Sequence, residues 1–88
     1  MNTEEFKLFI QSIGFVYQKQ MMSKEFYKLG EFDLVLNNPS HWMSTYTISQ
    51  KIQLGVTRTI LKNVVSDVKD DLDIFKSIIR EHKLNKLL

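Results

Sequence analysis

The last third of the chain carries apolar residues at alternating steps of four and three. This stripe consists of Leu61, Val65, Val68, Leu72, Phe75 and Ile79. On an α-helix, such spacing places every member on the same side. We therefore predict an amphipathic helix near the C-terminus, and its apolar side must be buried on the chain's own sheet or on another molecule.

The charge pattern indicates where this helix begins. The aspartates Asp67, Asp70, Asp71 and Asp73 are followed by the bases Arg80, Lys83 and Lys86. A helix over residues 66–84 places the acids near the positive end of its dipole and the bases near the negative end. A helix that began at Thr57 would instead place Arg58 and Lys62 near its positive end. We therefore predict the helix over 66–84.

Residues 50–65 fit two patterns. Ile52, Leu54 and Val56 alternate with polar residues or glycine, as in a strand. A recurrence at steps of four, through Ile48, Ile52, Val56 and Ile60, is typical of a helix. Because the dipole argument favours a later helix start, we predict a fourth strand over 52–61, and the helical alternative stays open.

The N-terminal segment has the pattern of a helix over residues 3–13. Asn2 and Glu5 have the spacing of a capping box. Its apolar side consists of Phe6, Phe9, Ile10 and Ile13. Gly14 follows directly and can adopt the left-handed conformation that ends a helix.

Between the helices the hydrophobic period becomes two, which indicates strands over 15–19, 26–37 and 41–49. Gly30 is expected to form a bulge in the second strand, and Pro39 lies in the turn before the third. The sheet residues expected to face the core are Phe32, Leu34, Leu36, Trp42, Tyr46 and Ile48. The chain is therefore predicted to be one α+β domain over residues 1–88. Its antiparallel sheet has three to four strands, with an N-terminal helix and a longer C-terminal helix packed on one face (α-β-β-β-(β)-α).

Composition narrows the class of protein. The chain has 88 residues, a net charge of +2 and no cysteine, so disulfides and thiolate metal sites are excluded. The acidic N-terminus is not followed by the apolar segment of a signal peptide, and no apolar run approaches the length that spans a bilayer. We expect a cytoplasmic protein without a membrane partner. Its size and composition are typical of small regulatory or inhibitory proteins of bacteria and phages.

No motif for catalysis or cofactor binding is present. The sequence has no His-x-x-x-His or His–Glu pair at ligand spacing, and the aspartate cluster lacks the glycine of a calcium loop. The serines lie outside any Gly-x-Ser-x-Gly setting, and the glycines stand too far apart for a phosphate loop. We therefore expect a protein that binds a partner without catalysis, metal or cofactor.

The face of the sheet opposite the helices is the first candidate binding surface. By strand alternation it carries Tyr27, Leu29, Val35 and Met43, beside Glu31 and Asp33. A mixed apolar and acidic face is typical of protein recognition. We expect the partner to be another protein, which includes a second copy of this chain.

The segment from Leu54 to Leu61 (LGVTRTIL) resembles the turn and recognition-helix start of helix-turn-helix DNA-binding proteins. This resemblance covers about a dozen residues, and Gln50 and Lys51 depart from the family's apolar and small residues. It implies an alternative function, nucleic-acid binding by residues 47–65, in which Lys51, Thr57, Arg58 and Lys62 face DNA. The element order also resembles that of double-stranded-RNA-binding domains, but aspartates replace the lysine-rich start of their second helix.

Overall fold

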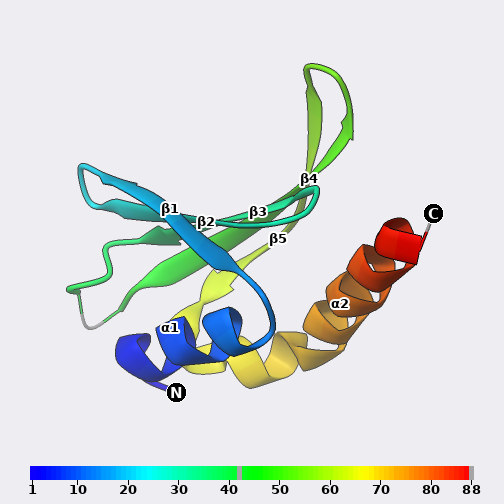
Figure 1. Cartoon of the computed structure of the whole chain (residues 1–88). Helices are drawn as coiled ribbons and strands as arrows, with labels where there is room; N and C mark the ends of the chain where they lie inside the picture. Colours follow the sequence, from blue (N-terminus) through cyan, green and yellow to red (C-terminus); the bar gives the residue numbers. More distant parts are fainter. Residues whose placement is uncertain (42, 88) are drawn as a thin grey trace.

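The computed structural model describes residues 1–41 and 43–87, with side chains through Leu84. Helix α1 (Thr3–Ser12) precedes strands β1 (Val16–Met21), β2 (Lys24–Leu29), β3 (Phe32–Asn37), β4 (Thr45–Gln53) and β5 (Val56–Val64), and the 3₁₀ helix η1 (Val65–Asp71) leads into helix α2 (Leu72–Leu87). The strands form one antiparallel sheet in the order β1-β2-β3-β4-β5. Both helices lie on one face of it (Figure 1). The predicted α+β class is confirmed, and the described sheet has five strands.

The N-terminal helix forms as its capping pattern predicts. The side chain of Asn2 accepts a hydrogen bond from the Glu5 backbone N–H at 2.8 Å, and the Glu5 carboxylate accepts one from the Asn2 N–H at 3.0 Å. Glu4 and Glu5 lie in the first turn, where the helix dipole favours negative charge. Phe6 and Ile10 are buried, so this helix is anchored by the apolar side that the sequence indicates.

The predicted strand over 26–37 is two strands. Gly30 has φ +59° and lies in the two-residue turn between Leu29 and Phe32, which pair with each other. The expectation of a bulge at Gly30 is therefore wrong. The turn changes which residues share a face. In one continuous strand, residues three apart point to opposite faces, but Leu29 and Phe32 both point toward the helices.

Residues 45–64 form a β-hairpin, with Gly55 at φ +77° in its turn. The predicted fourth strand is present as β5, but it begins at Val56 rather than at residue 52, because residues 52–53 end β4 and residues 54–55 form the turn. The helical alternative for residues 47–65 is wrong, and so is the helix-turn-helix arrangement that it implied. The third predicted strand begins at Thr45 rather than at residue 41, and the expected inward position of Trp42 lies outside the described residues.

The C-terminal helix occupies the predicted region, but its phase differs from the predicted stripe. Its first turns are 3₁₀, with non-helical angles at Asp67. Because 3₁₀ geometry aligns every third residue, Val65 and Val68 are buried together. In the α-helix α2 that follows, Phe75 and Ile78 are three residues apart on one side and are also buried. Leu72 is exposed and Ile79 only half-buried, so the stripe of steps of four and three is wrong at these two positions. Leu61, the first member of that stripe, belongs to β5.

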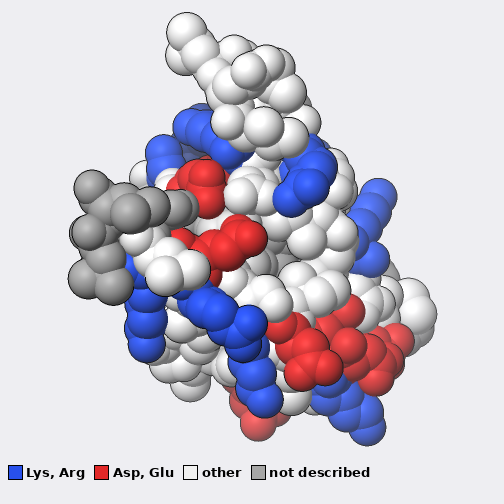
Figure 2. All heavy atoms as spheres, turned by 90° about the vertical axis from the view of Figure 1, so that its right-hand side faces the viewer, with Lys and Arg blue, Asp and Glu red and all other residues white. Residues whose placement is uncertain are grey.

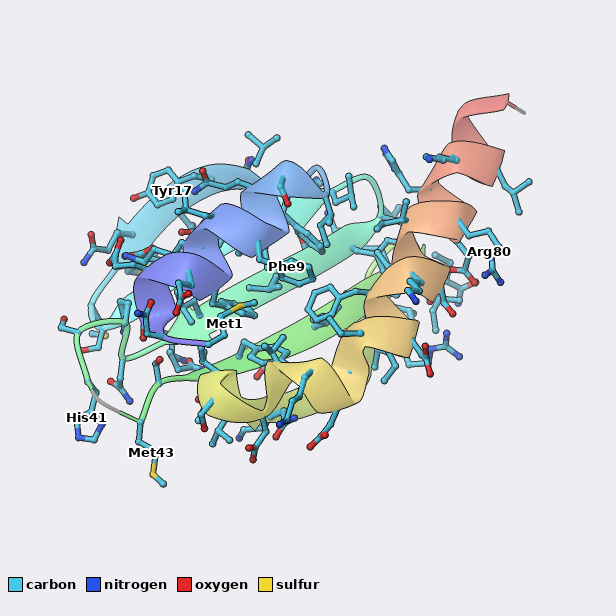
Figure 3. The ribbon with its side chains drawn as sticks, turned by 90° about the horizontal axis from the view of Figure 1, so that it is seen from below. Met1, Phe9, Tyr17, His41, Met43 and Arg80 are labelled. Atoms are coloured by element: carbon cyan, nitrogen blue, oxygen red, sulfur yellow. The ribbon has the colours of Figure 1, made fainter. Side chains whose placement is uncertain are left out.

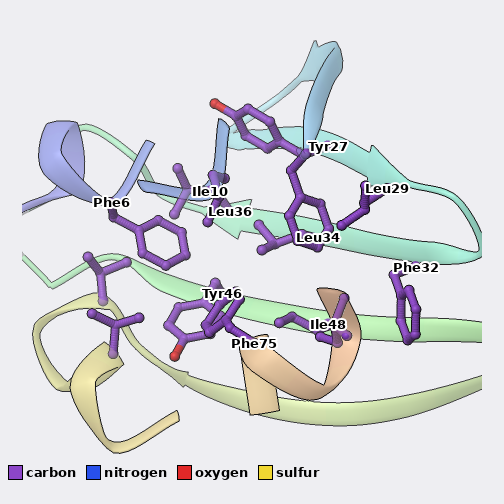
Figure 4. Close-up of a cluster of buried hydrophobic side chains, with 14 residues drawn as sticks. Phe6, Ile10, Tyr27, Leu29, Phe32, Leu34, Leu36, Tyr46, Ile48 and Phe75 are labelled. Atoms are coloured by element: carbon purple, nitrogen blue, oxygen red, sulfur yellow. The ribbon is translucent and has the colours of Figure 1, made fainter. Parts of the chain in front are cut away.

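The core lies between the helices and the inner face of the sheet (Figure 4). Its members are Phe6, Ile10, Phe15, Tyr27, Leu29, Phe32, Leu34, Leu36, Tyr46, Ile48, Val65, Val68, Phe75 and Ile78. The Phe6 ring stacks on Tyr46 at 4.7 Å between centroids, and Phe9 meets Phe75 edge to face at 5.2 Å. The first contact joins α1 to the central strand β4, and the second joins α1 to α2.

The turn at Gly30 yields a prediction about stability. A Cβ at this position would lie 2.5 Å from Nδ1 of His82 on α2, and the positive φ disfavours any L side chain. Replacing Gly30 by alanine is therefore expected to lower the free energy of unfolding by about 1–3 kcal/mol, measured by urea denaturation.

Gly55 provides the matched control. It also has a positive φ, but a Cβ at this position would have no atom within 4 Å. The Gly55→Ala variant should therefore lose less stability than Gly30→Ala, and adding His82→Ala should restore part of the loss only at Gly30. Equal losses for the two glycines, with no recovery from His82→Ala, would contradict the contact with His82.

Candidate functional site

The outer face of the sheet, opposite the helices, is the first surface to consider. Pairing places Phe26, Val35, Thr47 and Lys62 in one row across four strands of this face. Tyr27 and Leu29 point the other way and are only 2% and 7% exposed, so their assignment to a binding face is wrong. The cause is the turn at Gly30, which interrupts the alternation assumed for one continuous strand.

The other two predicted protein-binding residues lie apart. Val35 is on the outer face, as predicted, and is half-buried beside Phe26. Met43 is exposed, but it precedes β4 in the loop between β3 and β4, and its side chain points away from the sheet near His41 (Figure 3). The structure therefore does not bring the four predicted residues into one surface.

Lysines dominate the outer face. Strand alternation and pairing place Lys19, Lys24, Lys28, Lys51 and Lys62 there, with Asp33 as the accompanying acid. The remaining acidic residues of the chain belong to the helical side, the turns or the inner face: Glu4, Glu5, Glu25, Glu31, Asp67, Asp70, Asp71, Asp73 and Glu81. The expected mixed apolar and acidic face is therefore wrong in its charge: Asp33 lies on this face, but Glu31 lies in the turn between β2 and β3, and lysines outnumber acids. We call this electropositive surface the lysine face.

The centre of the lysine face is apolar and slightly hollow. A hollow of about 400 Å³ lies over β1 to β5, with Phe26, Val35 and Thr57 among its lining residues. The Nζ atom of Lys19 lies 5.4 Å from the centroid of the Phe26 ring, which is a cation–π distance. An aromatic ring thus forms part of the floor, and the groups around it are the ammonium groups of Lys19 and Lys28, the hydroxyls of Ser49 and Thr57, and the carboxylate of Asp33.

The tip of the β4–β5 hairpin is the second candidate surface. The last pairing between β3 and β4 joins Phe32 to Gln50, and beyond it the Lys51 N–H reaches the Glu31 carbonyl at 2.9 Å. Past this point β4 and β5 continue as a two-stranded ribbon that rises from the sheet (Figure 1). We call residues 51–57 the ribbon tip.

Aliphatic side chains cover the ribbon tip. Leu54 is fully exposed at 103%, and Ile52 and Val56 are 57% and 40% exposed. The chain has no Asp or Glu from residue 34 to residue 66, so no carboxylate interrupts this surface. In Figure 2 the ribbon tip is the pale projection at the top, and the acidic residues visible in this view lie below it.

The structure brings together part of the predicted nucleic-acid set. Lys51, Thr57 and Lys62 share the outer face, although strands and not a recognition helix position them. Arg58 lies on the opposite side, where its Nη2 donates to Oε1 of Gln50 at 2.7 Å. Gln50 in turn donates to the Glu31 carboxylate at 3.1 Å, so Arg58 belongs to a polar cluster beside α2.

The described residues offer no cluster of metal ligands at either surface. In the described part of the chain, no three His, Asp or Glu side chains come close enough to hold a metal ion. Within residues 1–41 and 43–87, no helix has both the length and the apolar character needed to cross a bilayer. The two surfaces therefore offer charge, hydroxyl groups and exposed apolar area, which are means of binding.

Sequence reasoning missed the two features that matter most here. The three N-terminal lysines of the outer face, Lys19, Lys24 and Lys28, are absent from the predicted sites, although Lys24, Phe26 and Lys28 alternate in one strand. At the ribbon tip the hydrophobic pattern predicts a strand but not its projection beyond the sheet. That alternation is the available signal for the lysines, and the absence of acids over residues 34–66 is the available signal for the ribbon tip. No protein-family model, no curated protein and no solved structure matches the chain.

Proposed function

We propose that this protein is a non-catalytic regulatory or inhibitory protein that binds another protein through the ribbon tip. The observation that carries the proposal is the fully exposed Leu54 between two further exposed aliphatic residues on a projecting ribbon. Burying a leucine side chain in a partner contributes about 1.5–3 kcal/mol, which makes Leu54 the strongest single contact available at the tip.

The chemistry of the tip specifies the partner surface. Ile52, Leu54 and Val56 require an apolar pocket, and the flanking Lys51 favours carboxylates around it. A two-stranded ribbon without a covering layer is only marginally stable, so contact with a partner also stabilises the ribbon itself. The sheet face with Tyr27 and Leu29 is not part of this proposal, because those side chains lie in the core.

The test compares the wild type with the double variant Ile52→Ser/Leu54→Ser. Tagged proteins are used to capture partners from the source organism, and size-exclusion chromatography with light scattering measures self-association. We expect the double variant to lose a partner that the wild type retains, or to become monomeric where the wild type is a dimer. The melting temperature should change by only a few degrees, because these side chains are exposed.

Leu8 provides the control, because it is an exposed leucine on α1, remote from the ribbon in the fold. The Leu8→Ser variant should retain the partner at the wild-type level. Equal retention by the Ile52→Ser/Leu54→Ser variant, or equal loss by both variants, would contradict a specific role of the ribbon tip.

A further inference from the structure

We infer that the lysine face is a binding site for single-stranded nucleic acid. This inference rests on the charge and shape of the outer sheet face, which shares Lys51 and Thr57 with the ribbon tip but none of its exposed aliphatic side chains. The face gathers Lys19, Lys24, Lys28, Lys51 and Lys62 around Phe26, with one carboxylate, Asp33. No helix covers it, because both helices lie on the opposite face of the sheet (Figure 1).

The polar groups of the face match a sugar–phosphate backbone. Lysine ammonium groups and serine and threonine hydroxyls are typical donors to phosphate oxygens. Pairing places Thr47, Ser49 and Thr57 on the same side of the sheet as the lysines. Protein–protein interfaces, in contrast, are depleted in lysine relative to the rest of a protein surface. The composition of the face therefore favours a nucleic-acid backbone over an acidic protein.

The hollow at the centre favours a single strand over a duplex. Phe26 and Val35 lie at the hollow, with Lys19 and Lys28 beside them. A base can stack on an aromatic ring only when its own face is free, and the bases of a duplex are already stacked on one another. A base on Phe26 would take the place of the Lys19 ammonium over the ring, and Lys19 would then pair with a neighbouring phosphate.

The experiment measures fluorescence anisotropy of a labelled oligothymidylate of about 20 nucleotides over a series of salt concentrations. The test variant is Lys19→Glu/Lys28→Glu/Lys62→Glu, and the control is Lys69→Glu/Lys76→Glu/Lys83→Glu on η1 and α2, which has the same net charge. We expect the outer-face variant to bind at least tenfold more weakly than the control. The slope of log Kd against log salt should be flatter by about 2 in the outer-face variant.

Phe26→Leu tests the stacking step, because it keeps an apolar side chain but removes the ring. We expect it to weaken binding about fivefold or more without a change in the salt slope. Circular dichroism confirms that each variant retains the wild-type fold. The ribbon variant Ile52→Ser/Leu54→Ser should bind the oligonucleotide like the wild type, so failure of one proposal is distinguishable from failure of the other.

Three results would overturn the inference. The first is an absence of binding at low salt, and the second is equal weakening by the outer-face and control variants. The third is competition by poly-glutamate, or by a duplex of mixed sequence, that equals competition by unlabelled oligothymidylate. Equal competition by poly-glutamate would indicate an acidic protein as the partner of this face.

Discussion

Replacement of Phe75 by alanine is expected to lower the free energy of unfolding by about 3–5 kcal/mol. Phe75 is buried between the helices and the sheet, with Phe9 at 5.2 Å and Tyr46 at 6.1 Å between ring centroids. A domain of 88 residues has a total stability of roughly 4–13 kcal/mol, so this loss is a large share of it. Urea denaturation at 25 °C measures the difference from the wild type.

Leu8→Ala is the control for this prediction. Leu8 is exposed on α1, and surface substitutions of this kind change stability by about 0.5 kcal/mol or less. A loss below about 1 kcal/mol for Phe75→Ala would contradict the close packing of α2 against the aromatic cluster. If the Phe75→Ala chain does not fold, Phe75→Leu gives a smaller loss that still exceeds the effect of Leu8→Ala.

The free energy of unfolding is expected to fall steeply above about pH 10. Burial raises the pKa of the Tyr46 hydroxyl, and its hydrogen bond to the Asp71 carboxylate raises this pKa further. Burial and the bond to Glu25, which is 2.8 Å long, raise the pKa of Tyr27 in the same way. Ionisation of either hydroxyl would place a negative charge at the edge of the core, beside the carboxylate of Glu25 or Asp71.

The direction of this pH dependence follows from the tyrosine pKa values, which are higher in the folded chain than in the unfolded chain. Below about pH 10 both tyrosines are protonated in the folded and the unfolded chain, so their full stabilisation is present. As the pH rises, the unfolded chain loses these protons first, and each lost proton favours unfolding. The stabilisation therefore disappears progressively between the ordinary tyrosine pKa and the higher pKa values of the folded protein.

Urea denaturation at pH 8 and at pH 10.5–11 measures this loss. The double variant Tyr27→Phe/Tyr46→Phe should lose less stability over this range than the wild type, although it starts lower at pH 8 because its hydrogen bonds are missing. Tyr17→Phe is the control, since Tyr17 is largely exposed and lies beside Tyr27. All other titratable groups are common to the wild type and the variants, so the difference between variants reports on the tyrosines. Identical pH dependence in the wild type and in the double variant would contradict the role assigned to Tyr27 and Tyr46.

The local sequence determined those features that depend on a few neighbouring residues. The capping box of Asn2 and Glu5 begins α1 at the predicted position, because its two hydrogen bonds join residues three apart. The alternation in Phe32, Leu34 and Leu36 placed all three side chains in the core. Charge also correctly excluded a helix beginning at Thr57, because Arg58 and Lys62 would have opposed its dipole.

The tertiary structure decided which residues each face presents. Gly30 can form a bulge or a tight turn, and only the pairing of β2 with β3 selects the turn that sends Tyr27 and Leu29 into the core. The 3₁₀ start of the C-terminal helix likewise depends on packing against the sheet, which is why Ile78 is buried in place of the predicted Ile79.

The two candidate binding surfaces also depend partly on the local sequence and partly on the tertiary structure. The sequence by itself determined an α+β chain with two apolar helix sides, alternating strands and an acid-free segment over residues 34–66. Only the order of the strands placed Lys19, Lys28 and Lys62 on one uncovered face, because Lys19 and Lys28 belong to the β1–β2 hairpin and Lys62 to the β4–β5 hairpin. Only the greater length of β4 and β5 relative to β3 made a ribbon project beyond the sheet. Local patterns specify the preferences of single elements, and contacts between distant segments determine which of their faces remain exposed to solvent.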